Sequence, residues 1–515
     1  MRFPPISNSC KGVRLDQKSF EALQEKNPLL AFEYLTASQK TCPRPQLPLP
    51  QKETRVLYVV GVGEPSWQRA LLEWLSQEEG RQVFFLIPSP ANLFYLSTEL
   101  LTHRKVKLHS FSALSSLEMT LERWEVMGED KERVYRTLLE KEMALSLYQE
   151  YGLGELTNLF DNLSVPAMSE TQLKGAFQKV PAVICGAAPS LNGEMKNLKE
   201  WAGRGLIFGV GSALAPLTEQ GIPLHFGVMI DPDPPLKRFL RQSAFDLPLI
   251  YQGQVSSQIL SSHQGPKIWF GAGGAFPLEE WLLEGRERVE PGWNGVTFAA
   301  HVALLMGCDP LIFVGVDLCL GEMGEYVAGV AADEERFAPI PAMDRDGKEV
   351  KTTADFLMAK EWLEGFAASH QETRFIQGSR GGLPLQGFQS QNLDLSFPQK
   401  DYDSMVHQAC ILGDELKSGM KKLNALDQSL RKTGELIENY LSFLKEKKNP
   451  LLIEIELEEE PFYSYHLIPM WEIWKSHLQT EEIIATMEDP ETEKKVQKLL
   501  FFQEVTSKFC HARNL

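Results

Sequence analysis

The chain has 515 residues, and its 52 lysines and arginines against 69 aspartates and glutamates give a net charge of −17. Hydrophobic residues make up 43% and charged residues 23%, values of folded globular proteins that exclude extensive disorder. The acidic balance argues against a protein that grips nucleic acid nonspecifically, because such binding depends on Lys and Arg.

The cysteines and the apolar segments indicate the cellular setting. The seven cysteines are an odd number without a C-x-x-C pair, which argues against a disulfide framework or a zinc site. The N-terminal residues carry no apolar signal-peptide core. The most apolar stretch, Val296 to Val316, is interrupted by His301, Asp309 and Pro310, which fits a helix, turn and strand in a folded core. We therefore expect a cytoplasmic protein with no membrane span.

The first 165 residues predict two short helices and then a small α/β domain. Residues 19–37 read as two amphipathic helices that meet at Pro28, and a proline-rich linker follows. Apolar strands are expected at Arg55–Val60, Val83–Ile87 and Val106–Phe111, with a helix from Trp67 to Gln77. Nearly continuous apolar strands indicate a parallel, Rossmann-like sheet covered on both faces. Residues 115–163 read as long helices.

The turn Gly61-Val62-Gly63 after the first strand invites a dinucleotide interpretation. The third glycine of that motif is missing, and no carboxylate stands about 20 residues further on to bind a ribose. A tight turn in a Rossmann-like scaffold is the better explanation.

A second α/β region extends from about Val180 to Phe388, with helices at Phe298–Met306 and Ala354–Ala368. Its strands are expected at Ala182–Cys185, Leu206–Val210, Phe226–Ile230, Leu249–Tyr251, Ile268–Phe270, Leu311–Gly315 and Phe375–Gln377. The pattern beyond Tyr402 is helical, from Met405 to Lys445 and again from about Glu481 to Lys508, and the acidic run Glu454 to Glu460 reads as a solvated loop or helix face. The expected domains are residues 1–165 (helices and Rossmann-like), 166–395 (central α/β, mostly parallel sheet) and 396–515 (helical).

The most informative local pattern is Val183–Leu191. A buried strand ends at Gly186, turns through small residues and enters a helix with apolar residues at helical spacing. Such a turn directs free backbone N–H groups and the positive helix end at one point, which suits a phosphate or diphosphate. Ser190 could cap the helix or bind the anion, and the alternative is an ordinary strand–helix turn.

Carboxylates follow two other buried strands. Asp231-Pro232-Asp233 comes after Phe226–Ile230, and Asp317 follows Leu311–Gly315. Because ligands of open α/β sheets bind at the carboxyl ends of strands, we expect Asp231 and Asp317 to share one cleft. Asp231 and Asp233 could hold Mg²⁺ or Mn²⁺, as D-x-D pairs do, although an exposed acidic turn or direct ligand contact by Asp231 is favoured. Asp317 could instead cap its turn.

Four further polar residues are candidates with structural alternatives. Asn294 and Thr297 begin the helix that ends at Met306, and they could cap it or contact a ligand. His225 and His301 could each act as a base, but a single histidine in an apolar segment is more often a packed core residue.

With these residues in view, the sequence resembles the motility accessory factor (Maf) flagellin glycosyltransferases. Their central domain is shared with archaeal 6-hydroxymethylpterin pyrophosphokinases (MptE-like proteins) and resembles bacterial sialyltransferases. The turn Gly186–Leu191 is similar to the G-x-G-P-S-L motif of this family. Further matching segments follow in order: Gly211-Ser212-Ala213, Gly221-Ile222-Pro223, Asp231, Gly307-Cys308-Asp309-Pro310, Gly315-Val316-Asp317-Leu318, Tyr326 with Gly329, and Gly378-Ser379-Arg380-Gly381-Gly382.

The resemblance implies a central sialyltransferase-like domain and a transferase that moves a nonulosonic sugar from a CMP donor to a Ser or Thr of a flagellin-like acceptor protein. Asp231 and Asp317, which end buried strands at the edge of the sheet, are the candidate catalytic residues for this transfer. The nucleotide contacts that the resemblance implies are Gly186, Ala187, Ala188, Pro189, Ser190, Gly211, Ser212 and Asn294. Two departures stand out: Ala188 replaces the second glycine, and Leu224-His225 replaces an acidic residue. The alternatives are a pterin-alcohol pyrophosphokinase that uses ATP and a non-catalytic interaction protein on a decayed transferase fold.

Overall fold

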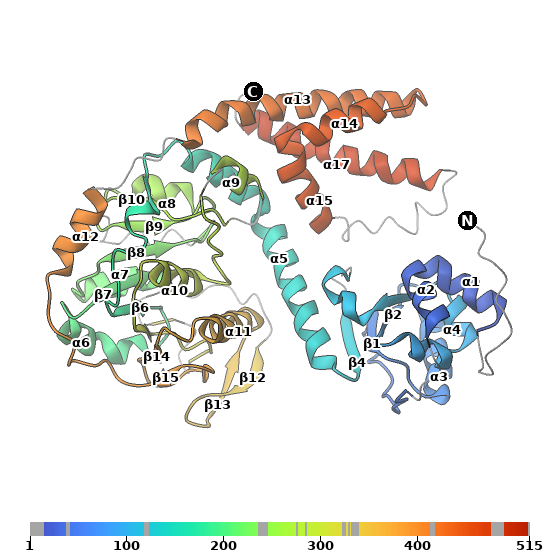
Figure 1. Cartoon of the computed structure of the whole chain (residues 1–515), viewed down its shortest axis with the longest axis horizontal. Coiled ribbons are helices and arrows are strands. Elements are labelled where there is room, and N and C mark those ends of the chain that lie inside the picture. The colour runs from blue at the N-terminus through green and yellow to red at the C-terminus, as the bar shows by residue number, and fades with distance from the viewer. Residues whose placement is uncertain are drawn as a thin grey trace. The chain divides into compact units, whose positions relative to one another are not determined.

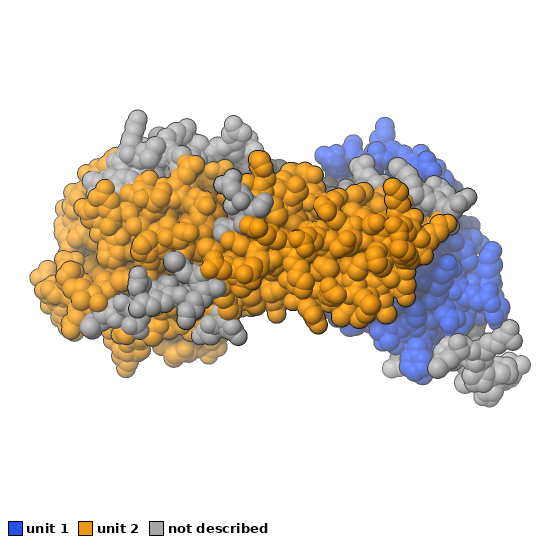
Figure 2. Space-filling view, turned by 90° about the horizontal axis from the view of Figure 1, so that it is seen from above, with its two compact units in different colours: residues 1–145 blue, residues 146–515 orange. Residues whose placement is uncertain are grey.

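The computed structural model describes residues 15–37, 42–117, 123–234, 246–273, 277–283, 286–321, 326–327, 330, 339–411, 418–474 and 489–512. Its contacts divide the chain into two compact units, Met1–Leu145 and Ser146–Leu515, which are coloured separately in Figure 2. The domain boundaries expected near residues 165 and 395 stay predictions. No described helix is both long and apolar enough to cross a membrane.

The first unit contains a four-stranded parallel sheet in the order β3-β2-β1-β4 (Figure 1). Its strands are β1 (Val56–Val60), β2 (Gln82–Ile87), β3 (Val106–Ser110) and β4 (Trp124–Gly128). Its helices are α1 (Gln17–Lys26), α2 (Pro28–Thr36), α3 (Pro65–Gln77) and α4 (Thr98–Thr102), with 3₁₀ turns at Pro90–Tyr95 and Phe111–Ser116. The helix pair expected to meet at Pro28 is confirmed.

Asn27 and Pro28 explain that helix pair. Asn27 ends α1, and its side chain accepts the N–H of Leu30 at 3.0 Å while Pro28 occupies the first position of α2. The prediction of helix throughout 115–163 is wrong at β4, which pairs with β1. Only five residues long and half-buried, β4 gives too short an apolar pattern to be distinguished from the helix that follows, α5 (Lys131–Asn162).

The second unit is built on a nine-stranded sheet, all parallel, in the order β15-β14-β11-β6-β7-β8-β9-β10-β5. The strands expected from the sequence are present as β6 (Ala182–Cys185), β7 (Leu206–Val210), β8 (Phe226–Met229), β9 (Leu249–Tyr251), β10 (Lys267–Trp269), β11 (Leu311–Val314) and β14 (Phe375–Gln377). The short edge strands β5 (Met168–Ser169) and β15 (Gln389–Ser390) were not expected.

Both faces of this sheet are covered. Ala182 and Ile184 of β6 pack in the core that contains α10 (Gly295–Leu305) and α11 (Ala354–Ser369). Val183 and Cys185, which alternate with them, pack against α6 (Leu191–Trp201) on the opposite face. Short helices α7 (Leu214–Glu219), α8 (Ser257–Ser262) and α9 (Pro277–Leu282) complete the layers.

The strand order reverses at β6. Strands β6 to β10 follow one another in one direction, and the chain then returns to place β11 on the other side of β6. The carboxyl ends of β6 and β11 therefore flank a topological switch point, where open α/β sheets bind ligands. Between β11 and α11 the chain also forms an antiparallel hairpin, β12 (Ile340–Met343) and β13 (Glu349–Thr352), which the sequence did not indicate.

The C-terminal part is helical, as expected. Its helices are α12 (Tyr402–Ile411), α13 (Ser418–Lys445), α14 (Leu451–Glu459), a π-helical turn (Tyr463–Leu467), α15 (Ile468–Trp474) and α17 (Pro490–Ala512). The acidic run forms the largely solvated α14, except that Glu460 is buried and pairs with Lys432 at 2.7 Å. Residues 475–488 of the expected second long helix lie outside the described residues.

Candidate functional site

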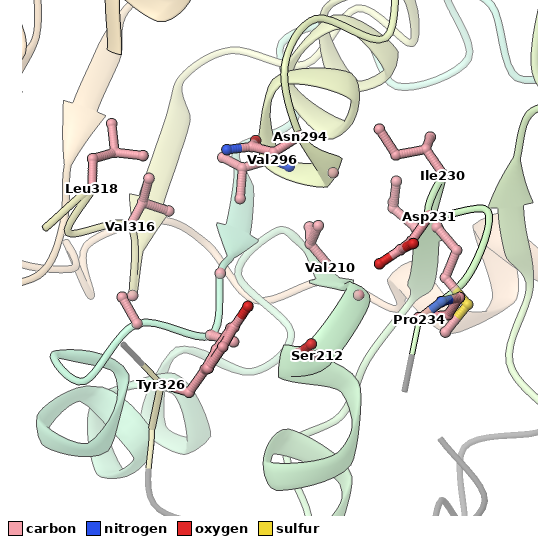
Figure 3. A pocket seen from close by; sticks show the side chains of 18 of the residues that line it. Val210, Ser212, Ile230, Asp231, Pro234, Asn294, Val296, Val316, Leu318 and Tyr326 are labelled. Atoms are coloured by element: carbon pink, nitrogen blue, oxygen red, sulfur yellow. Dashed lines mark hydrogen bonds between the residues drawn. The ribbon is translucent and has the colours of Figure 1, made fainter. Parts of the chain in front are cut away.

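A cavity of about 210 Å³ opens at the switch point, beyond the carboxyl ends of β6, β7, β8 and β11 (Figure 3). Its lining residues are Gly186, Ala187, Ala188, Val210, Gly211, Ser212, Val228, Met229, Ile230, Asp231, Pro234, Val255, Ile259, Asn294, Gly295, Val296, Gly315, Val316, Asp317, Leu318, Cys319, Tyr326 and Phe356. Most of the candidate nucleotide-binding residues are therefore brought to one place, whereas Pro189 and Ser190 are not among its lining.

Asp231 and Asp317 both line this cavity, so the expectation that they share one cleft is confirmed. Asp231 is exposed, and Figure 3 shows its carboxylate turned toward the middle of the cavity. Its Oδ1 accepts the backbone N–H of Asp233 at 3.1 Å. Asp233 is exposed and does not line the cavity.

Asp317 is held against the turn that follows β6. Its Oδ2 accepts the backbone N–H of Ser190 at 3.0 Å, and its Oδ1 accepts the Ser190 hydroxyl. Only 8% of Asp317 is exposed, and this burial raises the pKa of its carboxyl group, although the bonds from Ser190 and the charge of Arg345 act in the opposite direction. Asp317 is thus a buried carboxyl group at the N-terminal end of α6.

The backbone donors of the β6–α6 turn are largely occupied. The N–H of Gly186 bonds the carbonyl oxygen of Val314 at 2.9 Å, and that of Ala188 bonds Gly315 at 3.0 Å. The expectation of free N–H groups is wrong for these two residues and for Ser190. Ser190 also makes no side-chain cap, and its hydroxyl donates to Asp317 instead.

Two glycines allow the turns after β6 and β11 to touch. A Cβ added at Gly186 would lie 2.5 Å from the carbonyl oxygen of Gly315, and one added at Gly315 would lie 2.5 Å from that of Gly186. Gly315 also has a left-handed φ of 65°. Ala188, where the family motif has glycine, is not among the residues with positive φ, so the backbone at this position accepts alanine.

Ser379 and Arg345 further stabilise the turns that hold Asp317. The Ser379 hydroxyl lies 3.1 Å from that of Ser190 and accepts the N–H of Gly315 at 3.3 Å. Arg345, in the turn between β12 and β13, donates to the carbonyl oxygens of Ser379 and Gly381, the latter at 2.9 Å. The glycine-rich segment 378–382 was recognised in the sequence, but no sequence signal linked Arg345 to it.

Asn294 and Thr297 form a capping box at the start of α10. The Asn294 Oδ1 accepts the N–H groups of Val296 and Thr297, each at 3.0 Å, and the Thr297 hydroxyl accepts the Asn294 N–H at 3.0 Å. Thr297 is fully buried and structural. Asn294 lines the cavity as well, so it combines a capping role with a place at the cavity wall.

Neither candidate histidine lines the cavity. His225 is buried, and its Nδ1 accepts the N–H of Ile207 at 2.9 Å; burial lowers its pKa, which keeps the ring neutral at pH 7. The His301 ring lies against Phe366, with 5.6 Å between ring centroids. Both belong to the packing of the domain, the role that the apolar context favoured.

Other walls of the cavity are apolar side chains that the sequence analysis did not single out as ligand contacts. They are the aliphatic, sulfur-containing or aromatic side chains of Met229, Ile230, Val255, Ile259, Leu318, Cys319 and Phe356. Leu318 has a left-handed φ of 52°, which is uncommon for a residue with a side chain, and its carbonyl oxygen accepts the Thr352 hydroxyl at 2.7 Å. Apolar side chains carry no signal that separates a cavity wall from a core. Of the matched pair Tyr326 and Gly329, Tyr326 lines the cavity, while Gly329 lies outside the described residues.

The charged residues among the described lining of the cavity are acidic. Within the described part of the chain, its lining includes Asp231 and Asp317 but no Lys, Arg or His. The same residues include no group of three or more His, Cys, Asp or Glu side chains placed to hold a metal ion. Metal binding by Asp231 and Asp233 stays a prediction.

Comparison with known proteins agrees with this fold. Residues 155–322 match the family described as 6-hydroxymethylpterin diphosphokinase MptE-like. The solved Maf glycosyltransferase of Magnetospirillum magneticum AMB-1 is similar over 96% of this chain and 83% of that chain, with a TM-score of 0.51 and 13% identity. No curated protein matches the chain. The resemblance to Maf and MptE-like proteins is confirmed, and the α/β fold is glycosyltransferase-like.

Proposed function

We propose that this chain, a protein with an MptE-like domain and a Maf glycosyltransferase-like fold, is itself a nucleotide-sugar-dependent glycosyltransferase. The observation that carries the proposal is the shared cavity of Asp231 and Asp317 at the switch point of the large sheet. The donor would be a CMP-activated nonulosonic sugar, and the acceptor a Ser or Thr hydroxyl of a flagellin-like protein.

Asp231 is suited to act as the general base. Its exposed carboxylate faces the cavity, where it would take the proton of the acceptor hydroxyl while that oxygen attacks the anomeric carbon. The bond from the anomeric carbon to the phosphate oxygen breaks, and CMP leaves with the electron pair. Asp317 is buried and bonded to Ser190, so its role is to fix the β6–α6 turn that borders the reacting groups.

A transfer assay with Asp231→Asn tests this role, and Asp233→Asn is the matched control. Asn keeps the size of Asp231 and removes the charge, so transfer should fall by about 100-fold or more, the usual contribution of a general base. Asp233→Asn should retain activity, because Asp233 contacts Asp231 only through its backbone N–H among the bonds described. Equal activity of the Asp231→Asn variant and the parent would refute the assignment. Parallel assays with EDTA and with added Mg²⁺ or Mn²⁺ test a metal contribution.

The MptE-like match supports a second candidate, pyrophosphoryl transfer from ATP to a pterin alcohol. A panel of nucleotides separates the two functions by the thermal stabilisation that each ligand produces. Stabilisation by CMP supports the glycosyltransferase, and stabilisation by ATP with Mg²⁺ supports the kinase. Stabilisation by neither supports a non-catalytic interaction protein.

A further inference from the structure

The exposed face of α14 carries apolar side chains that helix formation does not require. Leu452 is 75% exposed, Leu451 53% and Ile455 47%. Residues four apart lie one above the other on a helix, so Leu451 and Ile455 form one row and Leu452 lies beside it. Glutamine or lysine would favour a helix about as well as leucine does. We call these three side chains the α14 ridge, and their exposure needs another explanation.

The opposite face of α14 is already packed against its neighbours. Leu457 is fully buried in the core that includes α13 and α17, and Ile453 packs against the same core. The helix lies beside α13 (Figure 1), where the hydroxyl of Tyr440 donates a hydrogen bond to the carboxylate of Glu454. These contacts fix the rotation of α14 about its axis, so the fold itself holds the α14 ridge at the surface.

Carboxylates surround the α14 ridge. Lys495 pairs with Glu454 at 3.2 Å, and Lys432 pairs with Glu460 at 2.7 Å. The further carboxylates of this helix are exposed, and they belong to Glu456, Glu458 and Glu459. The pKa of Lys432 is raised by its hydrogen bond to Glu460 and by the charges of Glu456 and Glu459, as expected in a negative field along the helix. The surface is therefore apolar at its centre and acidic at its rim.

The acidic rim restricts what can cover the α14 ridge. A second copy related by two-fold symmetry would place the same glutamates against one another. The anionic headgroups of a membrane surface would also be repelled by them. Lys448, just before the helix, pairs with Glu446 at 2.5 Å and leaves the sign of this face negative. A partner with positive charge is complementary to the surface, whereas a second copy and an anionic bilayer are not.

We propose that the α14 ridge and its acidic rim are a docking surface for a basic amphipathic helix of a partner protein. Rows of side chains four apart on one helix pack into the grooves between such rows on another. The partner helix would bury apolar side chains against Leu452 and Ile455, while its lysines or arginines pair with Glu456 and Glu459. None of these four residues lines the cavity at the switch point, so the proposal does not depend on the proposed function.

Two synthetic peptides of about 18 residues, long enough to form a helix, test the surface on the full chain. Both contain leucine and lysine in the same proportion. In the first the leucines recur at three- and four-residue spacing, and in the second their order is scrambled so that no apolar face forms. Fluorescence anisotropy of the labelled peptides should show that the amphipathic peptide binds at least about tenfold more tightly. Equal affinities would mean that net charge alone drives binding, which overturns the proposal.

Leu452→Gln and Ile455→Gln locate the apolar contact, and Leu500→Gln on α17 is the matched control because Leu500 is 50% exposed. Each ridge variant should bind the amphipathic peptide at least about fivefold more weakly, the loss expected for a residue that contributes to an interface. The control should bind it as the parent does. Glutamine retains the helix propensity, so circular dichroism should show the same helix content in all three variants. Unchanged binding by both ridge variants, or an equal loss in the control, refutes the surface.

A double substitution, Glu456→Gln with Glu459→Gln, tests the acidic rim. Its control is Glu349→Gln with Glu372→Gln, which removes two exposed carboxylates of the central domain. The rim variant should weaken peptide binding at about 50 mM NaCl and have little effect at about 500 mM, where exposed charges are screened, whereas the effect of Leu452→Gln should persist at both. An equal loss in the rim and control variants overturns the charge complementarity.

Two further results would assign the α14 ridge to another occupant and overturn the proposal. The first is a dimer of the parent chain in sedimentation velocity that Leu452→Gln dissociates. The second is binding of the parent to vesicles of phosphatidylcholine and phosphatidylglycerol that Leu452→Gln abolishes. A parent chain that shows neither behaviour and binds the amphipathic peptide through Leu452 supports the partner helix.

Discussion

Gly315→Ala tests the close approach of the turns that build the cavity. The substitution carries two costs in the free energy of unfolding. A residue other than glycine at a left-handed φ such as the 65° of Gly315 costs about 1–2 kcal/mol. The new Cβ would also lie 2.5 Å from the carbonyl oxygen of Gly186 and 2.8 Å from the Cβ of Leu191, and relief of such overpacking costs about 1–3 kcal/mol.

Gly347→Ala isolates the second cost. Gly347 has a similar φ of 77°, but a Cβ placed there meets no described heavy atom within 4 Å. Both variants therefore share the backbone term, and Gly315→Ala should lose about 1–3 kcal/mol more. Urea unfolding of the full chain followed by tryptophan fluorescence measures the difference, provided that the transition of the second unit is resolved from that of the first. Equal destabilisation by the two substitutions would show that the turns do not touch.

Three further predictions concern the same unit. Ala188→Gly should leave the affinity for CMP within about twofold, because the backbone at Ala188 has no positive φ to relieve. The substitution should lower the free energy of unfolding by about 0.5–1 kcal/mol through chain entropy. A tenfold gain in affinity measured by calorimetry would contradict this prediction. Burial and the charge of Glu279 raise the pKa of Glu155 from 4.5 to about 7, so the stability that protonated Glu155 contributes is complete below pH 4.5 and is lost as pH rises through 7. Unfolding titrations should show a fall of no more than about 3 kcal/mol that Glu155→Gln abolishes, and an unchanged slope in the variant would refute the assignment. Arg345→Gln should destabilise the unit by about 1–3 kcal/mol, because it removes charge-assisted hydrogen bonds to Ser379 and Gly381. Arg345→Lys should restore only part of this stability, because lysine cannot donate in two directions from a planar group. Full recovery of stability by the lysine variant in a melting experiment would exclude the two-bond geometry.

The sequence indicated the central strands well because parallel strands buried on both faces are continuous apolar runs. Ala182–Cys185 and Leu206–Val210 have the expected bounds, and Asp231 and Asp317 reach one cavity because each directly follows such a strand. The hairpin β12–β13 was missed, since its strands are mostly exposed and Ile340–Met343 contains a proline. Local patterns carry no information on that pairing.

The sequence also does not reveal which hydrogen-bond donors are already paired within the protein. The turn at Gly186–Ser190 has the small residues that are typical of an anion site. Nothing in this segment shows that Asp317, 127 residues beyond Ser190, accepts the backbone N–H at the start of the helix. A long-range contact also determines the role of His225, which is structural because its ring accepts the N–H of Ile207 on the neighbouring strand. Such roles depend on the partner as well as on the residue.

The position of β11 beside β6 has a consequence for how this protein can be shortened and synthesised. During translation, strands β6 to β10 can pair as they emerge, but the cavity wall that carries Asp317 can form only after β11 has been made. Contacts from Ser379 and Leu383, which stabilise this wall, form later still. The Leu383 N–H donates to the Asp317 carbonyl oxygen at 2.8 Å. A fragment cut at residue 322, where the MptE-like match ends, would expose the edge of β11 that normally pairs with β14. The smallest autonomous fragment of this domain therefore extends past β14 and the glycine-rich segment, well beyond the region that sequence similarity delimits.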